Sequence, residues 1–96
     1  MLSITQIKTM VAKISKKYGV KRAYLFGSYA KGQANESSDI DILIERGEVK
    51  TYDAYYDLRE ELENTLGTEV DLVAIDGIKP RFFDLIKNER ILLYGA

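Results

Sequence analysis

Apolar residues recur every three or four positions at the start of the chain, which is the spacing of an amphipathic helix with one buried face. These positions are Ile7, Met10, Val11, Ile14 and Tyr18. Ser3 and Gln6 have the spacing of a capping box ahead of this run, and Gly19 follows it as a typical helix end. The pattern predicts a first helix over residues 4–18.

The same spacing returns in the middle of the chain and predicts a second long helix over residues 51–66. Its apolar face consists of Tyr55, Leu58, Leu62 and Leu66, and Gly67 lies just beyond its end. A short third helix is indicated by PRFFDLIKN, because Pro80 suits the first turn of a helix. Directly before the second long helix, Arg46 to Lys50 has the composition of a turn around Gly47.

Four short runs of β-branched, aromatic and aliphatic residues predict strands. They are KRAYLF at 21–26, DIDILIE at 39–45, TEVDLVAI at 68–75 and ILLY at 91–94. The order helix, strand, strand, helix, strand, helix, strand predicts an α+β domain, in the manner of an α/β sandwich, with a mixed sheet packed against helices. The length of 96 residues fits a single domain, residues 1–96.

Two carboxylates interrupt the second of these strands. Side chains alternate across a strand, so Ile40, Ile42 and Ile44 share one face while Asp39, Asp41 and Leu43 share the other. The isoleucines then form the core face, and the two aspartates project together from the reverse face. Such a pair suits Mg²⁺ or Mn²⁺, which bind carboxylate oxygens together with substrate phosphates. The alternative is that both aspartates are solvated residues at the margin of the sheet.

A third carboxylate, Asp71, lies inside the apolar run of the next strand, between Val70 and Leu72. The helix over 51–66 has the right length to return the chain to the sheet beside the first aspartate strand. Three aspartates from two strands then converge on a pair of metal ions. The alternative for Asp71 is a charged residue that protects an edge strand from pairing with another chain.

A Gly-Ser pair, Gly27 and Ser28, follows the first strand. Glycine lets the backbone approach an anion closely, the serine hydroxyl adds a donor, and Lys31 adds positive charge nearby. The segment is not a P-loop, because its second glycine is followed by Gln33 and Ala34 rather than Lys and Ser or Thr. The alternative is a turn residue followed by a helix N-cap.

The composition limits which partners and which catalytic side chains the protein can use. Lys and Arg total 14 against 15 Asp and Glu, so we expect no bulk electrostatic binding of nucleic acid. The chain has no cysteine and no histidine, which excludes disulfides, thiolate metal sites and a Ser-His relay. Catalysis must then use carboxylates, hydroxyls, lysine, arginine and metal ions held by oxygen. The sequence contains no signal peptide and no apolar run long enough to span a bilayer, so we expect a cytoplasmic protein without a membrane partner.

Together these features resemble a known family. GSYAKG…SSDIDILIE is similar to the phosphate-binding and metal-binding segments of the minimal nucleotidyltransferases, in the polymerase beta-like nucleotidyltransferase superfamily. The resemblance implies that Asp39 and Asp41 bridge two Mg²⁺ ions, with Mn²⁺ as the alternative metal. It also implies that Asp71 holds the catalytic metal and helps to activate the attacking hydroxyl. Gly27 and Ser28 would bind the β- and γ-phosphates of a nucleoside triphosphate.

One position departs from the family pattern. Lys31 stands where many relatives carry arginine, so the positive charge is kept while the bidentate grip on phosphate is lost. The sequence contains no recognisable motif for a particular nucleobase. The resemblance to the family nevertheless implies ATP as the substrate.

The resemblance also implies a partner. Members of this family act as antitoxins of toxin–antitoxin pairs, by transferring AMP from ATP to a tyrosine of a HEPN-domain ribonuclease toxin (AMPylation). A second hypothesis is a binding module with a vestigial site that neutralises its partner sterically. Its candidate contact residues are Tyr52, Tyr55, Tyr56, Phe82 and Phe83, although aromatics at such spacings more often fill the core. A third is a nucleotidyltransferase that acts on a small molecule.

Overall fold

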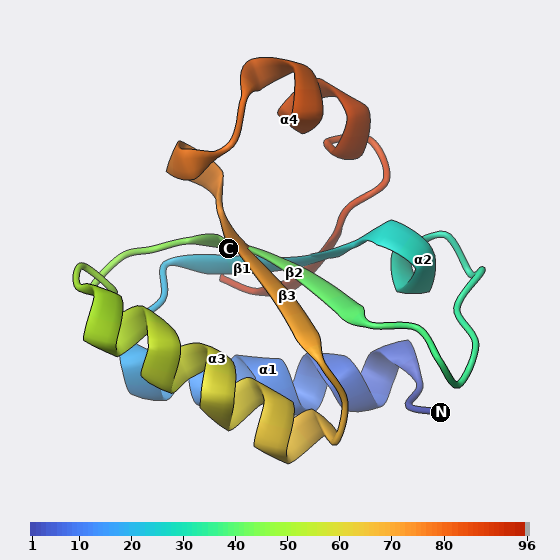
Figure 1. Ribbon diagram of the computed structural model, residues 1–96, viewed down its shortest axis with the longest axis horizontal. Helices are drawn as coiled ribbons and strands as arrows, with labels where there is room; N and C mark the ends of the chain where they lie inside the picture. The colour runs from blue at the N-terminus through green and yellow to red at the C-terminus, as the bar shows by residue number, and fades with distance from the viewer. Residues whose placement is uncertain (96) are drawn as a thin grey trace.

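The protein is a four-stranded mixed sheet with helices on both faces (Figure 1). This computed structural model describes residues 1–95; residue 96, the last of the expected domain, lies outside the described part. The helices are α1 (Ile4–Tyr18), α2 (Gly27–Ala30), α3 (Tyr52–Leu66) and α4 (Pro80–Ile86), with a 3-10 turn, η1 (Ile75–Gly77). The strands are β1 (Arg22–Phe26), β2 (Ile40–Glu45), β3 (Val70–Ala74) and β4 (Ile91–Tyr94).

Local signals place the long helices as predicted. Ser3 Oγ accepts from the Gln6 amide at 3.1 Å while Gln6 Oε1 accepts from the Ser3 amide at 2.8 Å, so the capping box is present. Helix α1 ends at Gly19, whose φ of 72° is the left-handed conformation expected of a helix stop. Helix α3 begins directly after its N-cap, Thr51. None of the helices within residues 1–95 has the length and apolar character needed to cross a membrane.

The strand order in the sheet is β3-β2-β1-β4. Strand β1 runs antiparallel to β2 and β4, whereas β2 and β3 are parallel. A parallel neighbour needs a crossover, and α3 supplies it, as the length of the predicted helix indicated. The sheet therefore places the two aspartate strands side by side, with β3 at an edge.

The main core lies between the sheet and the pair α1 and α3, which lie together on one face (Figure 1). Ile40, Ile42 and Ile44 are fully buried there, so the face assigned by alternation is confirmed. They pack in one cluster with residues that include Leu58 and Leu62 of α3.

A smaller core lies on the opposite face, beneath α4 (Figure 1). Leu43 is fully buried in it beside Phe26 and Ile86, and Phe82 packs against the cluster. The sequence predicts α4 as a helix and places Leu43 on the face of the aspartates, but it does not indicate that α4 covers part of this face. On this face of β2, α4 thus covers Leu43, whereas Asp41 remains partly exposed.

Candidate active site

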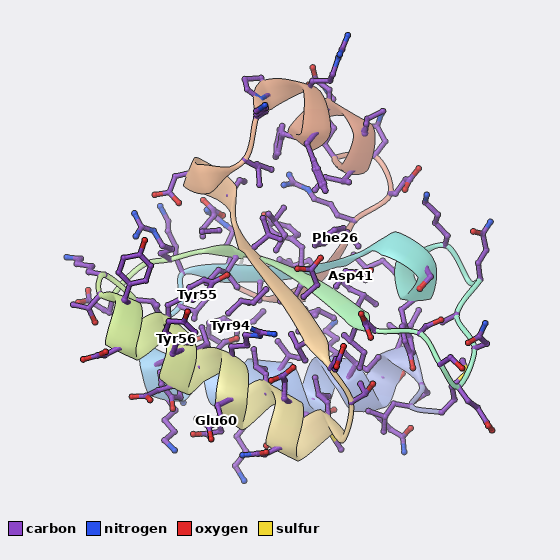
Figure 2. All side chains as sticks on the ribbon, in the orientation of Figure 1. Phe26, Asp41, Tyr55, Tyr56, Glu60 and Tyr94 are labelled. Carbon is purple, nitrogen blue, oxygen red and sulfur yellow. The ribbon has the colours of Figure 1, made fainter. Side chains whose placement is uncertain are left out.

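Asp41 and Asp71 occupy directly opposed positions on the parallel strands β2 and β3. Because paired residues of a sheet project to the same side, both carboxylates lie on the face opposite the isoleucine core. Figure 2 shows Asp41 with Phe26, its neighbour on β1, on the side of the sheet that faces α4. Asp39 is exposed and immediately precedes β2, at the entrance to the strand.

The environment of Asp41 disfavours its charge. Burial of this half-buried carboxyl, followed by the negative charges of Asp71 and Asp39, raises its pKa from 3.8 to about 6. The two other aspartates therefore lie close enough to interact with it electrostatically. A cation bound between these carboxylates would relieve the cost, which is the physical signature expected of a cation site.

Gly27 joins the predicted phosphate-binding element to the carboxylates. A Cβ added at this glycine would lie 2.0 Å from Asp41 Oδ2, so the carboxylate occupies the space that a side chain would fill. The φ of Gly27 is 71°, which also favours glycine. Helix α2 begins at Gly27 with Phe26 as its N-cap, so the alternative of Ser28 as an N-cap is wrong. The start of α2 at Gly27 and the Asp41 carboxylate therefore lie side by side.

Lys31 ends α2 and pairs with a residue that is remote in sequence. Its Nζ lies 3.4 Å from Glu89 Oε2, in the segment between α4 and β4. Both side chains are about half exposed, so the ion pair remains open to solvent. Lys31 therefore lies near Gly27, as predicted, and in this conformation its charge is shared with Glu89.

The donor set fits a hard divalent cation that also binds substrate. Within residues 1–95, no group of three or more histidine, cysteine, aspartate or glutamate side chains is already gathered as metal ligands. The site instead offers the opposed pair Asp41 and Asp71, with Asp39 at its entrance. Mg²⁺ commonly takes one or two carboxylates and completes its shell with phosphates and waters, so two opposed carboxylates suit it.

Three side chains of α3 hold the strand that carries Asp71. The amide of Ile40 donates to Glu69 O at 3.0 Å, so the backbone of the alternate residues Val70 and Leu72 points away from β2. The Tyr55 hydroxyl donates to Leu72 O, Arg59 Nε donates to Val70 O at 3.3 Å, and Glu63 Oε2 accepts from the Val70 amide at 3.0 Å. These contacts fix the backbone on both sides of Asp71.

The sequence analysis does not predict these hydrogen bonds from α3 to β3. Their sequence signal is the spacing of Tyr55, Arg59 and Glu63, which lie four residues apart along α3. Burial, and then the charge of Asp71, raises the pKa of the Tyr55 hydroxyl, so the tyrosine and the aspartate are electrostatically coupled. Asp71 lies on an edge strand, as the edge-protection alternative requires, and also opposite Asp41, as the site requires.

Tyr55→Phe is expected to lower the free energy of unfolding by about 1 kcal/mol, because Leu72 O loses its donor while the ring is kept. The matched control is Tyr56→Phe, since Tyr56 is 60% exposed and sits one residue further along the same helix. Urea unfolding of both variants measures the difference. Equal midpoints for the two variants would show that the Tyr55 hydrogen bond contributes nothing to holding β3.

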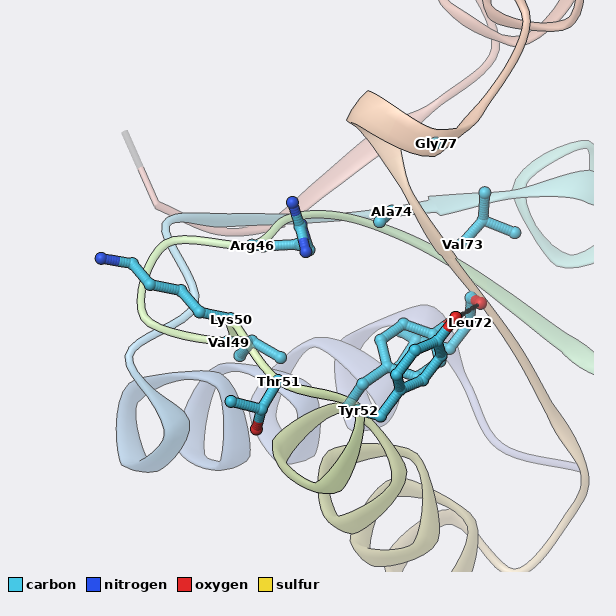
Figure 3. A pocket seen from close by; sticks show the side chains of 10 residues that line it. Arg46, Val49, Lys50, Thr51, Tyr52, Leu72, Val73, Ala74 and Gly77 are labelled. Atoms are coloured by element: carbon cyan, nitrogen blue, oxygen red, sulfur yellow. Dashed lines mark hydrogen bonds between the residues drawn. The ribbon is translucent and has the colours of Figure 1, made fainter.

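The cavity shown in Figure 3 is separate from the carboxylates and from the Gly-Ser element, although Tyr55 and Leu72 line it. It has a volume of about 490 Å³ and lies between β3, η1 and the start of α3. Its lining residues include Lys50, Tyr52 and Gly77 but none of the six predicted site residues. It borders the carboxyl ends of β2 and β3, whereas Asp39 precedes β2.

The five candidate contact aromatics divide between surface and core. Tyr52 and Tyr56 are 83% and 60% exposed, one turn apart on α3. Tyr55 is partly buried against the main core, and Phe82 packs edge to face on Phe26 with ring centroids 5.9 Å apart. Phe83 is also partly buried, and the Arg90 guanidinium lies 5.2 Å from its ring centroid. Only the two exposed tyrosines are therefore free to contact a partner without disturbing the packing of these rings.

Comparison with known proteins identifies the family of this chain. Residues 8–96 match the family described as polymerase beta, nucleotidyltransferase. A Methanocaldococcus jannaschii protein, provisionally named a protein adenylyltransferase, is 46% identical over 90 residues that cover 94% of this chain and 97% of that protein. The protein adenylyltransferase MntA of Thermococcus cleftensis is 35% identical over 82% of this chain and 84% of its own length.

A solved structure shares the fold. It is a toxin–antitoxin crystal structure with AMP-PNP, with a TM-score of 0.81 and 25% identity, over 93% of this chain and 73% of that one. The chain belongs to the polymerase beta nucleotidyltransferase family.

Proposed function

We propose that this protein transfers AMP from ATP to a tyrosine hydroxyl of a HEPN-domain toxin and thereby acts as its antitoxin. The observation that carries the proposal is the contact between Gly27 and the Asp41 carboxylate, because it joins the backbone proposed to bind phosphate to the carboxylates proposed to bind the cation. The relatives named as adenylyltransferases and the toxin–antitoxin structure with AMP-PNP support the choice of reaction and partner.

In the proposed complex, Gly27 and Ser28 bind the β- and γ-phosphates of ATP. The glycine permits close approach of the backbone, and the Ser28 hydroxyl donates to a phosphate oxygen. Asp39, Asp41 and Asp71 would hold two Mg²⁺ ions or their Mn²⁺ equivalents. Bound there, divalent ions would neutralise the charge that develops on the attacking and leaving oxygens of an in-line transfer.

The acceptor approaches Asp71, which is exposed on the edge strand. The tyrosine oxygen forms a bond to the α-phosphorus while the bond from that phosphorus to the bridging oxygen of the β-phosphate breaks. Pyrophosphate leaves with the electron pair of the broken bond. Asp71 orients the hydroxyl and takes its proton before the proton passes to solvent. The hydrogen bonds from Tyr55 to Leu72 O and from Arg59 to Val70 O hold the backbone on either side of Asp71 for this step.

The test is the intact mass of a purified HEPN-domain protein from the neighbouring reading frame, incubated with this protein, ATP and Mg²⁺. We expect the mass to rise by one or more adenylyl groups, and we expect no rise with the Asp39→Asn/Asp41→Asn double variant. No mass increase with the native protein, or an equal increase with the double variant, contradicts the proposal. Toxin neutralisation that persists unchanged in the double variant would instead support steric binding.

A further inference from the structure

The cavity shown in Figure 3 lies on the side of the proposed active site from which the acceptor approaches. In an in-line transfer, the attacking and leaving oxygens lie on opposite sides of the reacting phosphorus. The leaving phosphates are proposed to bind at Gly27, which follows β1, whereas Asp71 lies on β3, and β2 separates these two strands. The rest of the acceptor segment therefore extends away from Gly27, past the edge of the sheet that β3 forms.

Strand β3 connects Asp71 to this cavity. Leu72, Val73 and Ala74, the three residues that follow Asp71, all line it. Val73 projects to the same face of the sheet as Asp71, because side chains alternate along a strand. Ala74 lies about 10 Å beyond Asp71 along β3, at about 3.3 Å per residue. An extended chain whose tyrosine is bound at Asp71 thus reaches the cavity within a few residues.

The cavity offers side chains, rather than an open strand edge, to such a segment. Side chains of α3 already bond the outward backbone of Val70 and the carbonyl of Leu72. The cavity is lined instead by the ring of Tyr52, which is 83% exposed, and by the partly buried ring of Tyr55. Exposed aromatic rings beside a pocket supply much of the apolar contact area at protein interfaces. The walls therefore suit a peptide segment.

The charge of the lining indicates the kind of segment. Both charged residues that line the cavity, Arg46 and Lys50, are cations. Arg46 donates to the Asp76 carboxylate, so its charge is compensated. Lys50 is exposed and has no ion-pair partner within the described residues 1–95, and Figure 3 shows it at the end of the cavity away from Leu72. The complementary group for this lysine is a carboxylate.

We propose that this cavity binds the segment of the toxin that carries the acceptor tyrosine, and that an aspartate or glutamate of this segment pairs with Lys50. The inference rests on the proposed function and adds a chemical requirement for the partner. Lys50 lies beyond the end of β3 as seen from Asp71. At about 3.3 Å per extended residue, the acidic residue is expected about three to five positions from the acceptor tyrosine.

The test is the charge reversal Lys50→Glu, with Lys8→Glu as the matched control. Both lysines are exposed and both variants change the net charge equally, but Lys8 lies on α1 and does not line this cavity. The native protein first modifies the toxin, and peptide mass spectrometry locates the modified tyrosine. The KM for the toxin and the Kd for ATP are then measured with Mg²⁺ for each variant. Thermal unfolding confirms that both variants fold.

We expect Lys50→Glu to raise the KM for the toxin by about tenfold, because repulsion of the acidic residue replaces attraction. The Kd for ATP stays unchanged, since the cavity is separate from the Gly-Ser element. The Lys8→Glu control matches the native protein in both quantities. A toxin variant with lysine in place of the acidic residue shows the reverse pattern: its KM is raised with native protein and restored with Lys50→Glu.

Three results would overturn this proposal while AMP transfer by the native protein leaves the proposed function standing. The first is a raised Kd for ATP with an unchanged KM for the toxin, which would place the nucleotide in the cavity. The second is a toxin with no aspartate or glutamate within about five positions of the modified tyrosine. The third is a lysine variant of the toxin that does not restore the KM of Lys50→Glu. If the native protein transfers no AMP, the proposed function fails and this proposal fails with it.

Discussion

Asp41→Asn is expected to abolish AMP transfer and, at the same time, to stabilise the metal-free protein. Loss of this carboxylate removes one of the two opposed carboxylates proposed to bind the cation, and we expect the rate to fall by about a thousandfold or more. Stability moves the other way because asparagine fits the same space without the charge that burial and the charges of Asp71 and Asp39 disfavour. A functional carboxylate held at a cost to folding is expected to behave in this manner.

The stability gain depends on pH in a defined direction. The folded-state pKa of Asp41 is about 6 against 3.8 for the free carboxyl, so the folded protein binds the proton more tightly than the unfolded chain. The contribution of Asp41 to stability therefore falls as pH rises from about 4 to about 6, and the variant lacks this fall. After discounting for solvent screening of a half-exposed group, we expect about 1 kcal/mol above pH 6, or roughly 5 °C in Tm.

The measurement is thermal unfolding of native protein, Asp41→Asn and the control Asp57→Asn across pH 4 to 8, in the presence of a metal chelator. Asp57 is exposed on α3, so its replacement should leave Tm nearly unchanged. The same three proteins are then assayed for AMP transfer. A variant at Asp41 that is less stable than native protein at pH 8 would contradict the electrostatic account of this site.

Gly27→Ala is expected to disrupt the site through one methyl group. The new Cβ would meet Asp41 Oδ2 at 2.0 Å and Asp41 Cγ at 2.9 Å, so either the carboxylate or the start of α2 must move. The φ of 71° adds about 1–2 kcal/mol, because L-residues with a Cβ disfavour this region. We expect AMP transfer to fall by at least about a hundredfold, since displacement of a reacting group by an ångström costs this much.

A variant at a second glycine separates the steric effect of the new Cβ from the cost of the positive φ. Gly67 follows α3 with a φ of 73°, and an added Cβ there meets nothing within 4 Å. Gly67→Ala therefore carries the backbone cost alone, and its loss of stability in urea measures that cost. Gly27→Ala should lose more stability than this control and also lose activity, whereas Gly67→Ala should keep its activity. If both variants unfold alike and both remain active, the contact of Gly27 with Asp41 has no functional importance.

The parts of the fold that rest on local chemistry were predictable from the sequence. The capping box at Ser3, the helix end at Gly19 and the alternation through β2 are each decided by a few neighbouring residues, and the structure confirms them. The opposition of Asp41 and Asp71 was also accessible, because a helix the length of α3 brings the following strand back in parallel.

The parts that were not predictable depend on contacts between distant segments. Alternation assigns Leu43 to the face of the aspartates but does not say which element covers that face, and α4 covers it from 40 residues further along the chain. The contact between Gly27 and Asp41 likewise depends on how α2 turns against β2. The sequence places Tyr55 on the apolar face of α3 and makes Arg59 and Glu63 look like ordinary solvated helix residues. It therefore does not predict that these side chains bond to the backbone of β3.

Those last hydrogen bonds also protect the protein against aggregation. An open edge strand offers its backbone to any other extended chain, and β3 carries the run VDLV at such an edge. Side chains of α3 occupy the outward backbone groups of Val70 and the carbonyl of Leu72, so strand addition along this half of β3 must first displace the helix. Partial unfolding that releases α3 while the sheet persists would therefore create the aggregation-prone species. Its rate of formation, rather than global stability alone, would then determine how long the protein stays soluble on heating.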